Sequence, residues 1–227
     1  MIVHPSQRLQ RLGSSIFSQV AEWKREAAAG GLDVIDLGIG SPDRPPSLEV
    51  RRALAEAALR EDAYGYPTSE GSLAFRQAAA EWLRHRFGVS VDPVDEVTVL
   101  MGSQDGLGHL ALAVAEPGDL AIVPDPGYPI YAAGLAIAGV EGYPVPLREE
   151  NGYLIDFDSI PGDVARRAKL IVANYPSNPV SAVADRSFYE QLISFAKKFN
   201  LLVVHDAAYS ELAFDGFRPV SVLEIEG

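Results

Sequence analysis

Two patterns of apolar and polar residues alternate along the chain, and each predicts one kind of element. Short, continuous apolar runs predict strands that are buried on both faces. Longer stretches in which apolar residues recur every three or four positions predict amphipathic helices. The predicted strands are Val34–Leu37, Val97–Met101, Leu120–Val123, Val140–Leu147, Lys169–Ala173 and Leu201–Val204. The predicted helices are Ser14–Ala29, Ser47–Arg60, Ser72–Phe87, Gln104–Ala115, Ile130–Ala138 and Asp185–Phe199.

The order of these elements predicts the fold class. Apolar strands that are separated by helices favour an α/β fold, in which a mostly parallel sheet lies between two layers of helices. The first predicted helix precedes the regular part of this pattern, and Gly30-Gly31 follows it. We therefore expect a three-layer α/β domain with an N-terminal helical arm.

Composition narrows the possible partners. The chain has 227 residues, of which 48% are hydrophobic, so it can bury a sizeable core. Its net charge of −12 disfavours nucleic acid and anionic membranes as partners. It has no cysteine, which excludes disulfides, thiolate metal sites and cysteine nucleophiles. The first ten residues lack the apolar core of a signal peptide, so a cytoplasmic location is expected.

Ligands of parallel α/β sheets bind beyond the carboxyl ends of the strands, so the residues after each apolar run are the first candidates for a site. Gly102-Ser103-Gln104 opens a helix, and free N–H groups at a helix start can bind phosphate. An ordinary N-cap turn is the alternative interpretation. No Gly-Lys-Ser/Thr follows, so this is not a Walker A loop, and Gly38-x-Gly40 lacks the third glycine of a dinucleotide fingerprint.

Three further strand ends carry polar or aromatic residues. Tyr128 follows a Pro-Asp-Pro-Gly turn and can either stack on a flat ligand or cap the core. Asn174 and Asn178 lie in Asn-Tyr-Pro-Ser-Asn-Pro, where they can aim amide groups into a crevice or serve a turn. Asp206 directly follows four apolar residues, so we expect a buried carboxylate that needs a partner or caps a turn. His205 can be either a functional residue or a structural histidine.

Together these sites offer a phosphate cradle, an aromatic plate, an amide donor and a carboxylate, with the phenol of Tyr209 three residues after Asp206. A phosphorylated, aromatic, nitrogen-containing ring would use all of them. This description fits pyridoxal phosphate.

The sequence resembles the class I/II, fold-type I pyridoxal-phosphate aminotransferases from about Ser14 to its last residue. The segments that carry the resemblance are LGIGSPD, YGYPTSEG, NYPSNP and HDAAYSELAFDG, which look most like LL-diaminopimelate and aspartate aminotransferases. The resemblance implies transfer of an amino group from an amino acid to a 2-oxo acid by a homodimer. It also implies that residues 1–46 form an N-terminal arm and substrate loop, and residues 47–227 part of the cofactor-binding large domain.

The resemblance assigns roles by position. Gly40 matches the glycine whose N–H binds the substrate carboxylate, and Tyr66 matches a tyrosine that reaches the phosphate in the partner subunit. Asp206 matches the carboxylate that pairs with the ring nitrogen and keeps it protonated. The other implied cofactor-binding residues are those at the phosphate-binding helix start, the stacking residue, and the pair that binds the phenolic oxygen: Gly102, Ser103, Gln104, Tyr128, Asn178 and Tyr209. Asn178 is expected to contact substrate as well.

Two departures from the family pattern lie beside these residues. Many relatives continue Asn-Pro with Thr-Gly, where this chain has Val180-Ser181, and many have glutamate after the aspartate, where it has Ala207. Both changes leave the implied roles intact and alter only the expected packing below the ring.

The family's reaction requires a Schiff-base lysine in a Ser-x-x-Lys segment after the aspartate. We expect this lysine to lie beyond Gly227, because Lys24, Lys169, Lys197 and Lys198 are the chain's lysines and none follows a strand. The chain alone is therefore expected to be inactive. A non-catalytic cofactor-binding or dimerisation module is the alternative, and a nucleotide-binding α/β protein would rest only on the glycine loops.

Overall fold

The chain folds into two compact units, which are described separately. The computed structural model describes residues 4–12 and 16–226. One unit comprises Met1–Leu12 with Glu70–Gly227, and the other comprises Gly13–Ser69. Among the described residues, no helix is long and apolar enough to cross a membrane.

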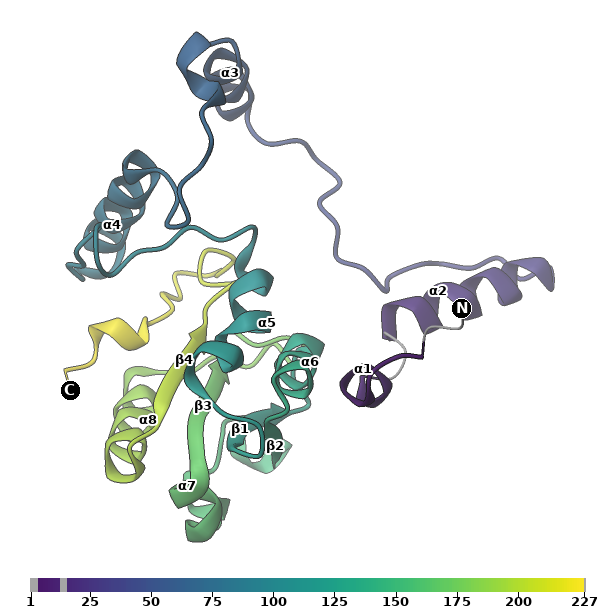
Figure 1. Cartoon of the computed structure of the whole chain (residues 1–227). Helices are drawn as coiled ribbons and strands as arrows, with labels where there is room; N and C mark the ends of the chain where they lie inside the picture. Colours follow the sequence, from purple (N-terminus) through teal and green to yellow (C-terminus); the bar gives the residue numbers. More distant parts are fainter. Residues whose placement is uncertain (1–3, 13–15, 227) are drawn as a thin grey trace. The chain divides into compact units, whose positions relative to one another are not determined.

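A four-stranded parallel sheet forms the centre of the first unit (Figure 1). Its strands are β1 (Leu120–Asp125), β2 (Glu141–Pro146), β3 (Ala168–Asn174) and β4 (Leu202–Asp206), in the spatial order β2-β1-β3-β4. The registers place β3 and β4 so that Asn174 lies opposite Asp206. The predicted parallel sheet is confirmed, and its carboxyl ends meet at one edge.

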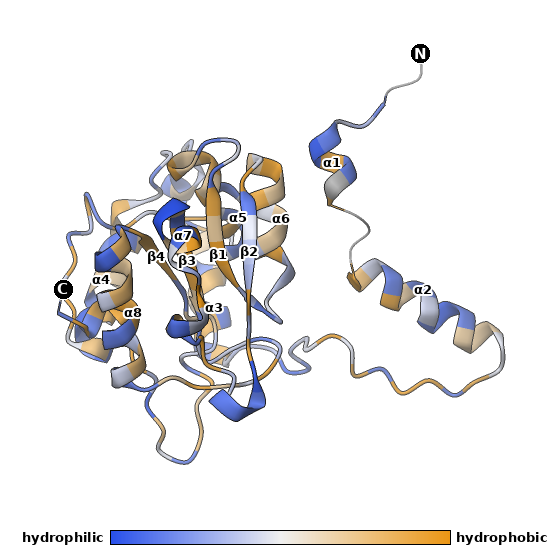
Figure 2. Ribbon diagram, turned by 90° about the horizontal axis from the view of Figure 1, so that it is seen from below, coloured by the Kyte–Doolittle hydropathy of each residue, from blue (hydrophilic) through white to orange (hydrophobic). Residues whose placement is uncertain are grey.

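Helices cover both faces of this sheet. Alternate residues of β1 point to opposite faces, with Ile122 in one apolar cluster and Val123 in the other. The first cluster includes side chains of α7 (Gly162–Arg167) and α8 (Arg186–Phe199). The second includes those of α5 (Ser103–Val114) and α6 (Pro129–Ala138). The strands β1 and β3 are apolar over most of their length (Figure 2). This arrangement is the predicted three-layer order.

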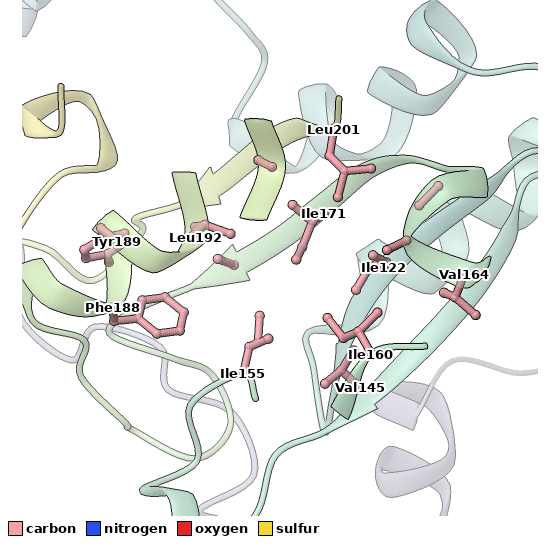
Figure 3. Close-up of a cluster of buried hydrophobic side chains, with 14 of the residues drawn as sticks. Ile122, Val145, Ile155, Ile160, Val164, Ile171, Phe188, Tyr189, Leu192 and Leu201 are labelled. Atoms are coloured by element: carbon pink, nitrogen blue, oxygen red, sulfur yellow. The ribbon is translucent and has the colours of Figure 1, made fainter. Parts of the chain in front are cut away.

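The larger apolar cluster fills the space between the sheet and the α7/α8 layer. Ile122, Ile171 and Leu192 are fully excluded from solvent, and Val145 nearly so. Their side chains converge between the strands and α8 (Figure 3). Burying side chains of this size contributes about 1.5–3 kcal/mol each, so this cluster stabilises the unit substantially.

The helices α5 and α6 approach each other at two glycines. A Cβ atom at Gly134 would lie 2.8 Å from the carbonyl oxygen of Leu107 and 3.2 Å from the Cα of Gly108. A side chain at this position would therefore push the two helices apart. Because glycine has no side chain, the backbones of α5 and α6 are in contact here.

The same unit also contains α1 (Gln7–Arg11) and α4 (Leu73–Phe87). The Ser72 side chain caps α4 by accepting from the Phe75 N–H, and Gly88 ends it with a φ of 72°. The short 3-10 turns of this unit are Glu149–Asn151, Phe157–Ser159 and Val222–Glu224. The short helices α1 and α7 were not predicted, because five or six residues are too few to show a period.

The second unit contains α2 (Ile16–Ala29), α3 (Leu48–Ala58) and a 3-10 turn at Glu61–Tyr64. Ser47 caps α3 as predicted, by accepting from the Val50 N–H. Ser14, the expected start of the first helix, lies outside the described residues. None of residues 16–69 is buried, so this unit has no core of its own.

Two predicted strands are absent from the described residues, and both predictions were wrong. Val34–Leu37 is irregular and exposed, with Ile35 at 82% and Leu37 at 91%. Val97–Met101 is also irregular, and Val99 donates its N–H to the Glu70 carbonyl instead of joining the four-stranded sheet. An apolar run becomes a strand only where another strand pairs with it.

Candidate functional site

The loops after β1, β3 and β4 leave the sheet at one edge, as parallel strands require. Tyr128 and Asn178 lie in two of these loops and Asp206 is the last residue of β4. The structure brings these predicted residues into one neighbourhood of hydrogen bonds. The peptide bonds before Pro126, Pro176 and Pro179 in these loops are cis.

Asn178 and Tyr209 form a pair across two of these loops. The Asn178 Nδ2 donates to the Tyr209 hydroxyl at 3.2 Å, and both residues are half-buried. An amide and a phenol held together in this way present donors to a common acceptor. The two residues predicted to act as a pair thus lie in contact.

Asp206 ends β4 with its carboxylate held at both oxygens. Oδ1 accepts from the Ala208 N–H at 3.2 Å, and Oδ2 accepts from the Tyr131 hydroxyl at 2.7 Å. The residue is half-buried, so the prediction of a buried carboxylate needs correction. The strand ends at Asp206, and the turn that follows exposes part of it. A half-buried carboxylate with two donors is oriented but still accessible to a further partner.

Tyr131 was missed by the sequence analysis. It lies on α6, is 5% exposed, and donates its hydroxyl proton to Asp206. Burial and, secondarily, the hydrogen bond to Asp206 raise the pKa of the Tyr131 hydroxyl well above its usual range, so it stays a donor. The sequence did contain a signal for Tyr131. It follows Tyr128 by three residues at the start of a helix, and residues three apart on a helix are neighbours. The two rings meet edge-on with centroids 6.1 Å apart.

Tyr128 joins the aromatic part of the site to the start of α5. Its hydroxyl donates to the Gln104 Oε1 at 2.8 Å, although the two residues are 24 apart in sequence. Gly102 is the N-cap of α5 with a φ of 83°, and among the described side chains none caps this helix. Exposed N–H groups at Gly102, Ser103 and Gln104 therefore face solvent, where they can bind an anion.

Asn174 was noted in the sequence as a possible amide donor but was assigned no role at the site. It is 4% exposed, its Nδ2 donates to the Asp206 carbonyl, and its Oδ1 accepts from the Asn178 N–H. The signal was present in its sequence motif, but its hydrogen-bond partners lie on two loops. Local pattern does not show which loops meet.

His205 occupies a structural position, which is one of its two interpretations. Its Nδ1 accepts from the Val222 N–H, and its Nε2 contacts the Tyr189 hydroxyl at 2.9 Å and the Tyr175 carbonyl at 3.3 Å. Those partners indicate that Nε2 carries the proton. Burial lowers the pKa of the His205 imidazole because it disfavours the charged form.

Gly40 and Tyr66 belong to the Gly13–Ser69 unit. Tyr66 is fully exposed there, and a Cβ at Gly40 would meet no atom within 4 Å. Their expected roles toward substrate and phosphate stay predictions.

The model of the class I and II aminotransferase family matches residues 32–227. The chain belongs to the class I and II aminotransferases. The predicted resemblance is therefore confirmed, and with it the cofactor, since aminotransferases of this family depend on pyridoxal phosphate.

Individual relatives agree with this assignment. An LL-diaminopimelate aminotransferase from Moorella thermoacetica is 48% identical over 223 residues, and one from Syntrophobacter fumaroxidans is 47% identical over 222. Each alignment covers 98% of this chain and 57% of the relative. The chain thus spans 57% of the length of these curated aminotransferases.

Solved structures show the same partial match. Substrate-bound BacF from Bacillus subtilis superposes with a TM-score of 0.90 at 40% identity and covers all of this chain, which covers 57% of BacF. A probable N-succinyldiaminopimelate aminotransferase from Thermus thermophilus gives a TM-score of 0.86 at 41% identity, with 94% of this chain and 57% of that one covered. The aminotransferase fold is therefore shown.

The residues present at the strand ends fit pyridoxal phosphate in the chemistry of their donors and acceptors. The site combines a carboxylate for a ring nitrogen, an amide–phenol pair for a ring oxygen, and an uncapped helix start for a phosphate. Each feature belongs to the same unit and the same edge of the sheet.

The lysines of this aminotransferase unit lie elsewhere. Lys169 is the second residue of β3, at the strand end opposite to Asn174, and Lys197 and Lys198 are in the last turn of α8, which leads into the start of β4. Lys24 belongs to the Gly13–Ser69 unit, where it pairs with Asp36 at 2.6 Å. Lys169, Lys197 and Lys198 therefore all lie away from the carboxyl edge of the sheet.

Proposed function

We propose that residues 70–227 form the pyridoxal-phosphate-binding part of an aminotransferase that moves an amino group from an amino acid to a 2-oxo acid. The observation that carries the proposal is a connected set of side chains at one sheet edge. Hydrogen bonds join Gln104 to Tyr128 and Tyr131 to Asp206, and the rings of Tyr128 and Tyr131 are in edge-on contact. Asn174 links Asp206 to Asn178, which is bonded to Tyr209. The start of α5, Gly102-Ser103-Gln104, would hold the phosphate.

The remaining residues would hold the ring. Tyr128 would stack on it, and the Asn178–Tyr209 pair would donate to its phenolic oxygen. Asp206 would hold a proton on the ring nitrogen, because an ionised carboxylate with a fixed direction favours the protonated form of its partner. Tyr131 would keep that direction by occupying Oδ2.

When bound, pyridoxal phosphate supplies an electron sink for the pair of electrons left after an amino acid loses its α-proton. The protein's contribution at this edge is to orient the ring and to keep its nitrogen protonated. Gly40 would bind the substrate carboxylate through its backbone N–H, and Asn178 would contact the substrate as well.

The relatives support a substrate class. The two enzymes cited above, with 47–48% identity, are named LL-diaminopimelate aminotransferases. We propose a substrate of the LL-diaminopimelate, aspartate or glutamate type for the whole protein. We also propose a homodimer, in which Tyr66 would reach the phosphate of the partner subunit.

The chain's own lysines support a second proposal about residues 1–227. Since Lys169, Lys197 and Lys198 lie away from the carboxyl edge, we propose that they do not bind the cofactor covalently. Residues 1–227 alone would then bind pyridoxal phosphate without transferring amino groups.

The test is titration with pyridoxal 5′-phosphate, followed by borohydride reduction and mass spectrometry. Asp206→Asn keeps the shape and removes the charge, so its dissociation constant should rise about tenfold or more, since a hydrogen bond to a charged group is worth about 1.5–3 kcal/mol. Asp125→Asn is the matched control, because Asp125 ends β1 at the same edge. The dissociation constant of this variant for pyridoxal phosphate should lie within about twofold of the parent value.

Two outcomes would contradict these proposals separately. Absence of saturable binding by the parent chain would overturn the cofactor-binding role. A reduced adduct on one specific lysine among Lys169, Lys197 and Lys198 would overturn the claim that these lysines do not react.

A further inference from the structure

The buried amide of Asn174 connects the segments that carry Asn178 and Asp206, the two residues proposed to bind the oxygen and the nitrogen of the ring. It is the last residue of β3, directly across from Asp206 in the parallel register. Only 4% of its surface is exposed, so its polar atoms must find partners within the protein.

All of those partners lie in the two loops. The Asn174 Nδ2 donates to the Asp206 carbonyl at 2.8 Å and more weakly to the Pro176 carbonyl at 3.4 Å. Its Oδ1 accepts from the Asn178 N–H at 2.8 Å. One planar amide thus fixes the backbone on which the Asp206 carboxylate is mounted and the backbone on which the Asn178 amide is mounted.

The side chains of these two residues are oriented by other groups. Tyr131 and the Ala208 N–H hold the carboxylate of Asp206, and Tyr209 holds the amide of Asn178. The Asn178–Tyr209 contact also joins the two loops, and the pairing of β3 with β4 places the two strand ends side by side. Asn174 adds the one side chain that is bonded directly to the backbones of both Asp206 and Asn178, and it therefore fixes their spacing most directly.

We propose that Asn174 is a positioning residue that sets the spacing between Asn178 and Asp206, and through it the affinity of the site for the ring of pyridoxal phosphate. This inference rests on the proposed function, because it takes both residues as ring ligands. It concerns a residue that makes no contact with the ring itself.

The test is calorimetric titration of the chain with pyridoxal 5′-phosphate. Asn174→Ala removes all three bonds and should raise the dissociation constant about tenfold to hundredfold, the loss typical of removing a group that orients a ligand-binding residue. Asn174→Ser retains a hydroxyl that cannot span both loops, and it should show a similar loss. Asp119→Ala is the control, because Asp119 accepts from the Glu116 N–H just before β1, at the opposite edge of the sheet.

A double variant distinguishes positioning from a general loss of stability. If Asn174 acts through Asn178, the loss in Asn174→Ala/Asn178→Ala should be smaller than the product of the two single losses. Multiplicative losses, or an Asn174→Ala affinity within twofold of the parent, would overturn the proposal. So would failure of both Asn174 variants to fold while Asn178→Ala folds, since that would assign Asn174 to the core.

The proposed function fails in a different way. If the parent chain does not bind pyridoxal phosphate, the cofactor-binding role itself is wrong. If the parent binds and the Asn174 variants bind equally well, only the positioning role is wrong.

Discussion

The two units of this chain use similar helices with opposite results. In residues 70–227, α5, α6, α7 and α8 lie against a parallel sheet and bury two apolar clusters. In residues 13–69, α2 and α3 carry apolar side chains as well, but none of the described residues there is buried. Amphipathic helices need a partner surface, and the sheet supplies it in one unit only.

The site lies entirely in the unit that has a core, apart from the two predictions at Gly40 and Tyr66. Its side chains come from the ends of rigid strands and helices, which hold them through hydrogen bonds over long sequence separations. The difference between the units therefore predicts where mutations affect stability.

The largest effect is expected from a matched pair of leucines. Leu192 on α8 is fully buried, and Leu54 on α3 is 71% exposed. Leu192→Ala should lower the free energy of unfolding by about 2–5 kcal/mol through lost burial and a cavity. Leu54→Ala should change it by less than about 0.5 kcal/mol. Urea unfolding followed by far-UV circular dichroism measures both. Equal losses would show that α3 is packed as tightly as α8.

A smaller effect is expected at two helix caps of similar geometry. Ser72 accepts from the Phe75 N–H at 3.3 Å in the first unit, and Ser47 accepts from the Val50 N–H at 3.4 Å in the second. Ser72→Ala should lower the free energy of unfolding by about 1 kcal/mol. Ser47→Ala should reduce the helix content at α3. It should leave the urea midpoint of the first unit unchanged, because α3 buries no side chain. A shifted urea midpoint for Ser47→Ala would contradict the comparison.

The smallest effect is a pH dependence confined to the unit with a core. Burial lowers the pKa of the folded His205 below its unfolded value of about 6.5. Below that pH the unfolded chain binds the additional proton first, so stability is present above it and falls as the pH drops. Protonation of Nδ1 would also displace the Val222 N–H.

His205→Gln should flatten the decline in melting temperature between about pH 7.5 and 5.5, the range that brackets the unfolded pKa. His4→Gln is the control, because His4 is exposed and lies before α1, outside both apolar clusters. An unchanged slope in His205→Gln would show that other groups cause the decline.

The sequence predicted most of the sheet, and which candidate residues meet at its carboxyl edge, for one physical reason. Continuous apolar runs predicted β1, β3 and β4, and parallel geometry then required Asn178 and Asp206 to meet at the same edge. The Asn178–Tyr209 contact follows from that requirement. The family resemblance added roles to residues whose proximity the pattern already predicted.

The remaining features depend on partners that a local pattern does not specify. Val97–Met101 is apolar enough for a strand but lacks a neighbour in the four-stranded sheet. Tyr131 reaches an acceptor 75 residues away, and Asn174 reaches one 32 residues away. Turn residues and apolar periodicity predict the structure of single segments. The contacts of Tyr131 and Asn174 with Asp206 depend instead on which segments pack together in the fold.

The close approach of Gly108 and Gly134 has a consequence for the hydrogen bond between Tyr128 and Gln104. Gln104 lies in the first turn of α5 and Tyr128 is the N-cap of α6, so the bond joins the starts of the two helices that meet at these glycines. A methyl group at position 134 would meet the Leu107 carbonyl and push the helices apart without touching any proposed ligand. A substitution in a helix interior would in this way reach two residues of the proposed site.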